Sequence, residues 1–156
     1  MKEIRIGRYG AVALVDDDDF EILNQYKWSR DKDLNTSYGY RSDKGKWLFM
    51  HRVILGLTDP KIHVDHINGD GLDNRRCNLR TANHSQNQMN ARKRKNCTSI
   101  YKGVSYDKGK GKWMACAGLN GKVLKLGLYT DEKEAARVYN DFAKKHYKEF
   151  ARLNDV

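Results

Sequence analysis

Apolar and polar residues alternate near the start of the chain, and this pattern predicts short strands. Ile4 and Ile6 flank a polar residue, and a run of apolar residues follows at 11–15. Side chains of a strand point alternately to its two faces, so this spacing buries one face. Four aspartates at 16–19 then precede apolar residues at helical spacing. Acidic residues complement the dipole at a helix start, so we expect a helix near 17–26 rather than a metal site.

The next apolar runs predict a hairpin and a buried helix. Trp28 and Trp47 enclose a segment with a polar turn at 43–46, as is typical of a hairpin. Residues 51–57 (HRVILGL) are apolar enough to form a short buried helix. His51 opens this run, and we expect a satisfied core histidine or a phosphate contact there rather than a catalytic group.

The middle of the chain is rich in His, Asp and Asn, and its pattern is polar. Asn-Gly and Asp-Gly pairs at 68–71 predict a turn, residues 78–80 a brief return strand, and residues 81–92 a helix. Neighbouring side chains on a strand point to opposite faces. We therefore expect the side chains of Asp65 and His66 to diverge.

The last third of the chain predicts three antiparallel strands backed by one helix. The strand-forming runs are 100–107, 112–120 and 122–130, and an Asn-Gly pair between the last two is a strong hairpin signal. Asp131, with Glu134 three residues later, resembles a capping box. Apolar residues at helical spacing follow. The expected fold class of the whole chain is α+β.

Positive charge is concentrated in the last part of the chain. Residues 1–90 hold 14 Lys+Arg and 13 Asp+Glu, whereas residues 91–156 hold 16 and 7. This asymmetry, with aromatic residues among the lysines, favours nucleic acid as the partner. The basic run at 91–99 predicts an arm along a phosphate backbone. We therefore divide the chain into a first domain at 1–92, a basic linker at 93–99 and a second domain at 100–156.

Composition argues against secretion and membrane insertion. The chain is 39% hydrophobic and 32% charged, as is typical of a soluble globular protein. No stretch approaches the roughly 18 apolar residues of a membrane span, and the start lacks the apolar run of a signal peptide. The cysteines form no C-x-x-C pair, which indicates neither a disulfide framework nor a cysteine zinc site. We expect a cytoplasmic protein.

Residues suited to phosphodiester hydrolysis lie in the polar middle segment. Such hydrolysis needs a base that takes a proton from water and a cation that neutralises the phosphate. A histidine with a pKa near neutrality suits the base, and a carboxylate with an amide oxygen suits Mg²⁺. His66 fits the first role, and Asp65 with Asn87 fits the second.

The same segment has two weaker interpretations. A zinc site could use His63, His66 and His84, but no cysteine supplies a fourth ligand at finger-like spacing. A calcium loop over 65–74 would place Ile67 at a ligand position, where its side chain cannot bind a cation.

The pieces VDHINGD, LDNRRCNLR and HSQNQMN resemble the HNH nuclease motif, a ββα-metal fold, in the version found in phage and intron-encoded homing endonucleases. The resemblance covers about residues 47–92. It implies that His66 is the general base and that Asn78 pins the loop and orients the base. It also implies that Asp65 and Asn87 share one Mg²⁺ or Mn²⁺. Asn87 stands where many members have His, which argues against an all-histidine zinc site.

Residues 100–154 resemble the DNA-binding domain of plant ethylene-response factors, the Apetala-two type. The matching pieces are YKGVSYD, GKWMACAG and KLGLYTDEKEAARVYNDFA. That family lays its sheet into the major groove of DNA, which admits two strands. Trp113 and Tyr101 are equally compatible with the core. Several family arginines are absent, so the family's base preference is not carried over. The resemblance implies DNA contacts at Lys102, Ser105, Tyr106, Lys112, Trp113, Cys116 and Lys125.

Together these features predict a metal-dependent homing-type endonuclease acting on double-stranded DNA. The resemblance implies a phage or mobile-element origin and action in the host cytoplasm, and one HNH unit per chain is compatible with a monomer. Arginines near the motif are expected to clamp phosphates, and linker residues to follow the backbone. Two alternatives remain open, namely a DNA-binding regulator with an inactive HNH unit and a structure-selective phage nuclease. The arginines are Arg75, Arg76 and Arg80, and the linker residues are Arg92, Lys93, Arg94 and Lys95.

Overall fold

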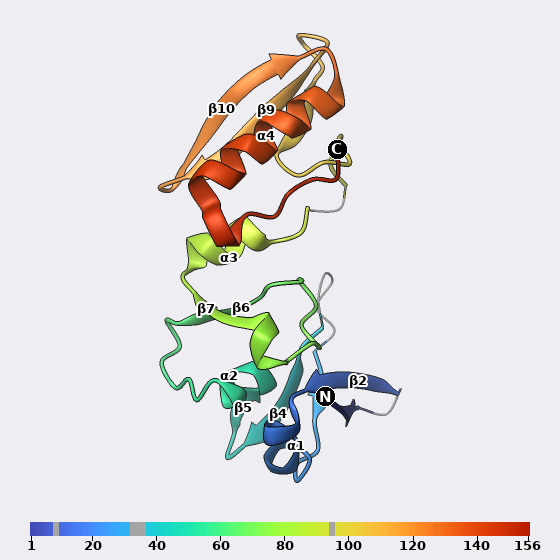
Figure 1. Cartoon of the computed structure of the whole chain (residues 1–156), viewed down its shortest axis with the longest axis vertical. Helices are drawn as coiled ribbons and strands as arrows, with labels where there is room; N and C mark the ends of the chain where they lie inside the picture. The colour runs from blue at the N-terminus through green and yellow to red at the C-terminus, as the bar shows by residue number, and fades with distance from the viewer. Residues whose placement is uncertain (8–9, 32–36, 94–95) are drawn as a thin grey trace. The chain divides into compact units, whose positions relative to one another are not determined.

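The computed structural model of the protein describes residues 1–7, 10–31, 37–93 and 96–156, which form two compact units, Met1–Asn83 and His84–Val156 (Figure 1). Each unit combines helices with small antiparallel sheets and has its own hydrophobic core. The predicted α+β class is confirmed. In the described part of the chain, no helix is long and apolar enough to cross a membrane.

The first unit is built from three small sheets and short helices. The predicted alternation near the start is confirmed, because Ile4 and Ile6 are buried while Arg5 between them is exposed. The helix after the aspartates ends at Leu23, three residues before the predicted end. The elements are β1 (Lys2–Ile6), β2 (Ala11–Val15), α1 (Asp17–Leu23), β3 (Ser29–Arg30), β4 (Gly39–Asp43), β5 (Lys46–Phe49), α2 (Met50–Ile54), β6 (His63–His66), η1 (Arg76–Asn78) and β7 (Leu79–Ala82).

The core of the first unit lies between the β1–β2 hairpin, α1 and α2. Trp28 is buried there, and its indole Nε1 donates to the carbonyl of Leu23, 2.8 Å away. Met50 and Ile54 on α2 pack into the same cluster, as the apolar run at 51–57 predicted. Burying such a side chain contributes about 1.5–3 kcal/mol, so this cluster holds the scaffold on which β6 and β7 lie.

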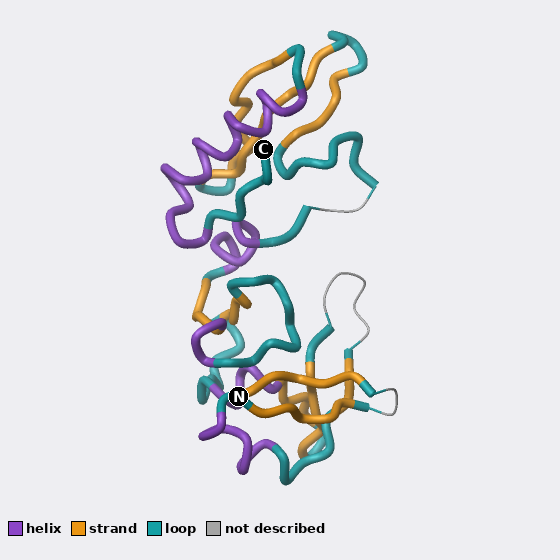
Figure 2. The backbone as a smooth tube through the Cα atoms, turned by 45° about the vertical axis from the view of Figure 1, so that its right-hand side comes forward, coloured by secondary structure: helices purple, strands orange, loops and turns teal. Residues whose placement is uncertain are grey.

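The second unit is a three-stranded antiparallel sheet with one long helix against it. The strand order is β8-β9-β10, and α4 packs along the sheet (Figure 2). The predicted cap is confirmed, since the Asp131 carboxylate accepts from the Glu134 amide at 2.9 Å. The elements are α3 (His84–Asn90), β8 (Val104–Asp107), β9 (Lys112–Leu119), β10 (Lys122–Tyr129), α4 (Glu132–Tyr147) and η2 (Lys148–Phe150).

The division between the units falls nine residues before the boundary predicted at residue 92. The reason is α3, which packs with the second unit through Met89 against a cluster that includes Ala117 and Tyr147. α3 also begins at His84 rather than at Thr81, because β7 continues through Ala82.

Candidate active site

The β6–β7 hairpin positions the two residues at the centre of the motif. In its antiparallel register Asp65 lies opposite Arg80, and His66 lies opposite Leu79. Asp65 and His66 are adjacent on β6, and their side chains contact different partners, Arg80 and Asn74. The loop 67–78 connects the two strands.

His66 is 5% exposed, and its Nε2 is hydrogen-bonded to a buried side chain. Its Nε2 lies 3.2 Å from the Oδ1 of Asn74, a residue with no exposed surface. The Asn74 Nδ2 donates to the Leu72 carbonyl at 3.3 Å, so its Oδ1 faces the histidine and can only accept. Nε2 of a neutral His66 therefore carries the proton, and Nδ1 holds the lone pair that a general base needs.

The surroundings of His66 keep the ring neutral. Burial lowers the pKa of His66, while the hydrogen bond to Asn74 and the charges of Asp65, Asp70 and Asp73 act in the opposite direction. Burial is the largest of these effects, so the pKa lies below its ordinary value. The basic form of His66 is then the dominant form at neutral pH.

Aromatic side chains surround His66 on the side of α2. The rings of His51 and Tyr38 lie with their centroids 5.2 Å and 5.6 Å from that of His66, and Phe49 stacks on His51 at 5.6 Å. His51 is half-buried, and it is not the satisfied core histidine that the sequence suggested. Its buried Nδ1 has no hydrogen-bond partner among the residues that the structure describes.

His51→Phe should make the first unit less sensitive to acid. Burial, with smaller effects of His66 and Arg52, lowers the pKa of His51 to about 3. The unfolded chain therefore binds an additional proton between pH 6.5 and about 3, and the free energy of unfolding falls as pH falls through this window, by at most about 1.4 kcal/mol per pH unit. Phenylalanine has no group that binds this proton, and the substitution breaks no hydrogen bond at Nδ1. Urea unfolding at pH 7, 5 and 4 should show a flatter dependence for the variant, and an equal slope in both proteins would contradict the assignment.

Asp65 is bound by Arg80 across the hairpin. The carboxylate is 4% exposed, and its Oδ2 accepts from Nε of Arg80 at 2.8 Å and lies 2.6 Å from Nη2. This guanidinium is itself only 17% exposed. Arg80 thus neutralises a buried carboxylate. A phosphate contact would have to use guanidinium N–H groups other than those directed at Asp65. Its role as a clamp stays a prediction.

Asn78 ties the two ends of the 67–78 loop together. Its Oδ1 accepts from the Asn68 amide at 3.0 Å, and its Nδ2 donates to the Asp73 carbonyl at 2.7 Å and to the Asn68 Oδ1 at 3.1 Å. Asn78 is buried, so these bonds form away from water. These contacts support the loop-pinning role predicted for Asn78. Its influence on the base stays a prediction.

Arg75 and Arg76 fasten the same loop to carboxylates. Arg75 donates to both oxygens of Asp73 at 2.7 and 2.6 Å and lowers the pKa of that carboxyl. Arg76 donates to both oxygens of Asp19 on α1 at 2.9 and 2.7 Å, and its amide donates to Asp16 at 2.7 Å. The four-aspartate run therefore anchors this loop as well as opening a helix. Contact of these arginines with phosphates stays a prediction.

The predicted metal ligands lie in different units. Asp65 belongs to the first unit, and Asn87, half-buried on α3, to the second, so shared ligation stays a prediction. Within the described ranges no three His, Cys, Asp or Glu side chains gather as metal ligands. The predicted pair does not need such a group. A carboxylate and an amide oxygen are hard donors, and this donor set fits Mg²⁺ or Mn²⁺.

The candidate DNA contacts of the second unit divide between the two faces of the sheet. Residues directly opposite on paired strands share a face. Ala115 and Ala117 are buried in the clusters beside α4, so Lys112 and Cys116 on β9 point to the outer face, as does Lys125, which lies opposite Cys116. Ser105 pairs with Met114 and shares this outer face.

Tyr106 and Trp113 lie on the other side of the sheet. Trp113 packs against the core cluster of Ala115 and Ala135, which supports the core alternative for this residue. The two rings meet edge to face at 4.9 Å. Tyr101 packs against the same cluster. The side chain of Lys102 lies against the main chain of α3, where its Nζ donates to the carbonyl of Gln88.

The basic linker is described in part. Arg92 is exposed and Lys93 is half-buried. Arg94 and Lys95 lie outside the described residues. Phosphate contact by this segment stays a prediction.

Sequence reasoning missed the groups that surround the base. Asn74 is one of several asparagines in the 67–78 segment, and no spacing distinguishes it from Asn68. Tyr38 lies far from the motif in the sequence and reaches His66 only through the fold. The apolar run after His51 was the only sequence signal for this side of the site.

Comparison with known proteins shows the family of the chain. A family model described as HNH endonuclease matches residues 49–89, which include Asp65, His66 and Asn78. An uncharacterised HNH endonuclease of Acanthamoeba polyphaga mimivirus is 32% identical over 152 residues, covering 94% of this chain and 76% of the relative. No solved structure matches the chain significantly. Because the similarity to the viral relative extends over almost the whole chain, the protein belongs to the HNH endonuclease family and is a DNA endonuclease.

Proposed function

We propose that the protein is a homing-type endonuclease that hydrolyses a phosphodiester bond of double-stranded DNA with Mg²⁺ or Mn²⁺. The observation that carries the proposal is the state of His66, which is buried, neutral and fixed by Asn74 beside the Asp65 carboxylate. Asp65 and Asn87 would hold the metal. When bound, the ion neutralises charge on the scissile phosphate and on the leaving oxygen.

His66 takes the proton from water at Nδ1. Its Nε2–H stays bonded to Asn74, so the ring does not rotate during the transfer. The imidazolium that forms is stabilised by the same amide oxygen and by the charges of Asp65, Asp70 and Asp73, which favour the protonated ring. Asn78 keeps the loop that carries Asn74 closed.

Binding of DNA is proposed for the outer face of the C-terminal sheet, as in ethylene-response factors. Ser105, Lys112 and Lys125 share that face, and a sheet of this kind fits the major groove. The linker adds phosphate contacts through Arg92 and Lys93. The proposed enzyme acts in the host cytoplasm. As a monomer it would nick one strand, because each chain carries one HNH unit, whereas a dimer would cut both.

Metal-dependent nicking of plasmid DNA tests the proposal. Supercoiled plasmids carrying a library of inserts are incubated with the protein in Mg²⁺, Mn²⁺ or EDTA. We expect open circles with either metal and none in EDTA, because phosphodiester hydrolysis of this type needs the cation. Salt-sensitive binding with no cleavage in either metal would instead support a DNA-binding regulator with an inactive site.

A further inference from the structure

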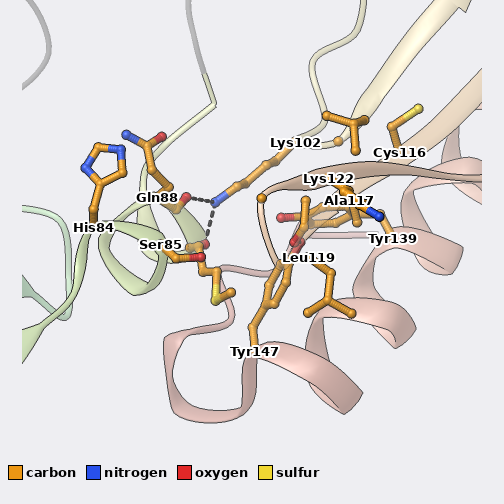
Figure 3. A pocket seen from close by; sticks show the side chains of 15 residues that line it. His84, Ser85, Gln88, Lys102, Cys116, Ala117, Leu119, Lys122, Tyr139 and Tyr147 are labelled. Atoms are coloured by element: carbon orange, nitrogen blue, oxygen red, sulfur yellow. Dashed lines mark hydrogen bonds between the residues drawn. The ribbon is translucent and has the colours of Figure 1, made fainter.

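Lys102, in the turn before β8, directs its side chain to the end of α3. Its Nζ donates to the main-chain oxygens of Gln88, at 3.3 Å, and Met89 (Figure 3). It also donates to the main-chain oxygen of Ala91, just after the helix, at 2.7 Å. The last carbonyls of a helix have no partner within it, and a cation there also complements the helix dipole. Lys102 is therefore a side-chain cap of α3.

The main chain of Lys102 is in turn hydrogen-bonded to the side chain of Asn154. Its amide donates to the Oδ1 of Asn154 at 2.7 Å, and the Nδ2 of Asn154 returns a bond to its carbonyl at 3.0 Å. Asn154 forms a second reciprocal pair with Asn140 on α4, at 2.7 and 2.9 Å. Asn140 is buried. A continuous chain of hydrogen bonds thus runs from α4 through Lys102 to the end of α3.

α3 needs this support because it is short. It has seven residues, and isolated helices under about 12–15 residues are only marginally stable in water. A hollow of about 600 Å³ is lined by residues of both α3 and the β9–β10 hairpin, such as Ser85 and Leu119. Met89 supplies an apolar contact of the helix with the core, and Lys102 supplies a polar one.

The face of α3 that carries Asn87 differs from the face held by the core. Two residues along a helix turn the side chain by about 200°, so Asn87 and Met89 point in nearly opposite directions. With Met89 against the cluster of Tyr139 and Tyr147, Asn87 is directed away from that cluster and stays half-exposed. The anchoring of α3 therefore determines where the Asn87 amide points.

We propose that Lys102 is a positioning residue for DNA cleavage, which acts by fixing α3 and hence the metal-binding amide of Asn87. The inference rests on the proposed function, in which Asn87 holds the metal. The unit that carries the DNA-binding sheet then also supplies one metal ligand, and metal binding depends on the cap of α3. Lys102 itself does not contact DNA.

Lys102→Met removes the donors and keeps most of the aliphatic stem. We expect DNA affinity within about twofold of a control, Lys133→Met, an exposed lysine on α4 that gives the same charge change. With enzyme in excess over DNA, cleavage should be about tenfold slower and half-maximal at a higher metal concentration, as for other groups that orient a metal ligand. Lys102→Arg keeps donors and should restore most of the rate. Hydrogen exchange should become faster at α3 amides in Lys102→Met and stay unchanged in β9.

Three outcomes would overturn the proposal. Equal losses of affinity and cleavage, with the metal dependence unchanged, would make Lys102 a DNA contact. Unchanged exchange at α3 would show that the cap does not hold the helix. If Lys102→Met cleaves at an unchanged rate with unchanged metal dependence, the cap of α3 does not affect cleavage. If the wild-type protein shows no metal-dependent cleavage, the proposed function fails and the positioning role fails with it, while hydrogen exchange still decides the cap itself. Asn154→Ala, which loosens Lys102 from α4, should reproduce the faster exchange.

Discussion

His66→Ala should abolish cleavage and leave DNA binding almost unchanged. A positioned general base contributes about 10²–10⁴-fold to a rate, so cleavage of bound DNA in Mg²⁺ should fall by at least about a hundredfold. Binding measured in EDTA should change little, because the proposed contacts with DNA lie largely on the sheet of the other unit. His146→Ala, on the exposed side of α4, is the matched control and should cleave as the wild type does.

The pH dependence of the wild-type rate gives a second readout of the same residue. Burial lowers the pKa of His66 below its ordinary 6.5. The basic form is therefore lost only below that value, so the rate should rise with pH on the acidic side and be level near neutrality. Cleavage by His66→Ala at close to the wild-type rate would contradict the assignment of the base.

Local sequence patterns predicted those parts of the fold that depend on local physics. Alternation identified the strand of Ile4 and Ile6, and the Asn120–Gly121 pair, with both φ angles positive, forms the turn between β9 and β10. Asp131 caps α4 as its spacing with Glu134 indicated. Each of these features is decided by neighbours in the sequence, so the sequence suffices to find it.

The partners of charged side chains could not be predicted in this way. Arg76 is paired with Asp19, which lies 57 residues away, and Lys102 with the carbonyls of a helix that was expected in the other domain. A basic residue near a nuclease motif suggests phosphate contact, but only the fold shows whether a carboxylate or a helix end is nearer. Asn74 was missed for the same reason, because its bond to His66 depends on how the loop closes.

Arg80→Met should destabilise the first unit by about 3 kcal/mol, because it removes the guanidinium from a buried carboxylate. Replacing one member of such a pair typically costs about 3–5 kcal/mol, and we take the lower end because Arg80 keeps some contact with solvent. Urea unfolding measures the loss, followed by tryptophan fluorescence in a Trp113→Phe background, so that the signal comes from Trp28 and Trp47 of the first unit. The double variant Asp65→Asn/Arg80→Met should recover part of the stability, since it no longer buries an unpaired charge.

The result decides between two roles of Arg80. If Arg80 is a phosphate clamp, Arg80→Met should bind DNA more weakly and keep the stability of the wild type. We expect this result for Arg92→Met, the matched change on the exposed linker. If Arg80→Met unfolds at the wild-type urea concentration and binds DNA more weakly, the ion pair with Asp65 contributes little. If instead stability falls and the double variant recovers it, the main role of Arg80 is to keep a charged Asp65 in place. In that case the ion pair with Arg80 stabilises the buried Asp65 carboxylate before any metal binds. This carboxylate is the ligand that the proposed metal requires.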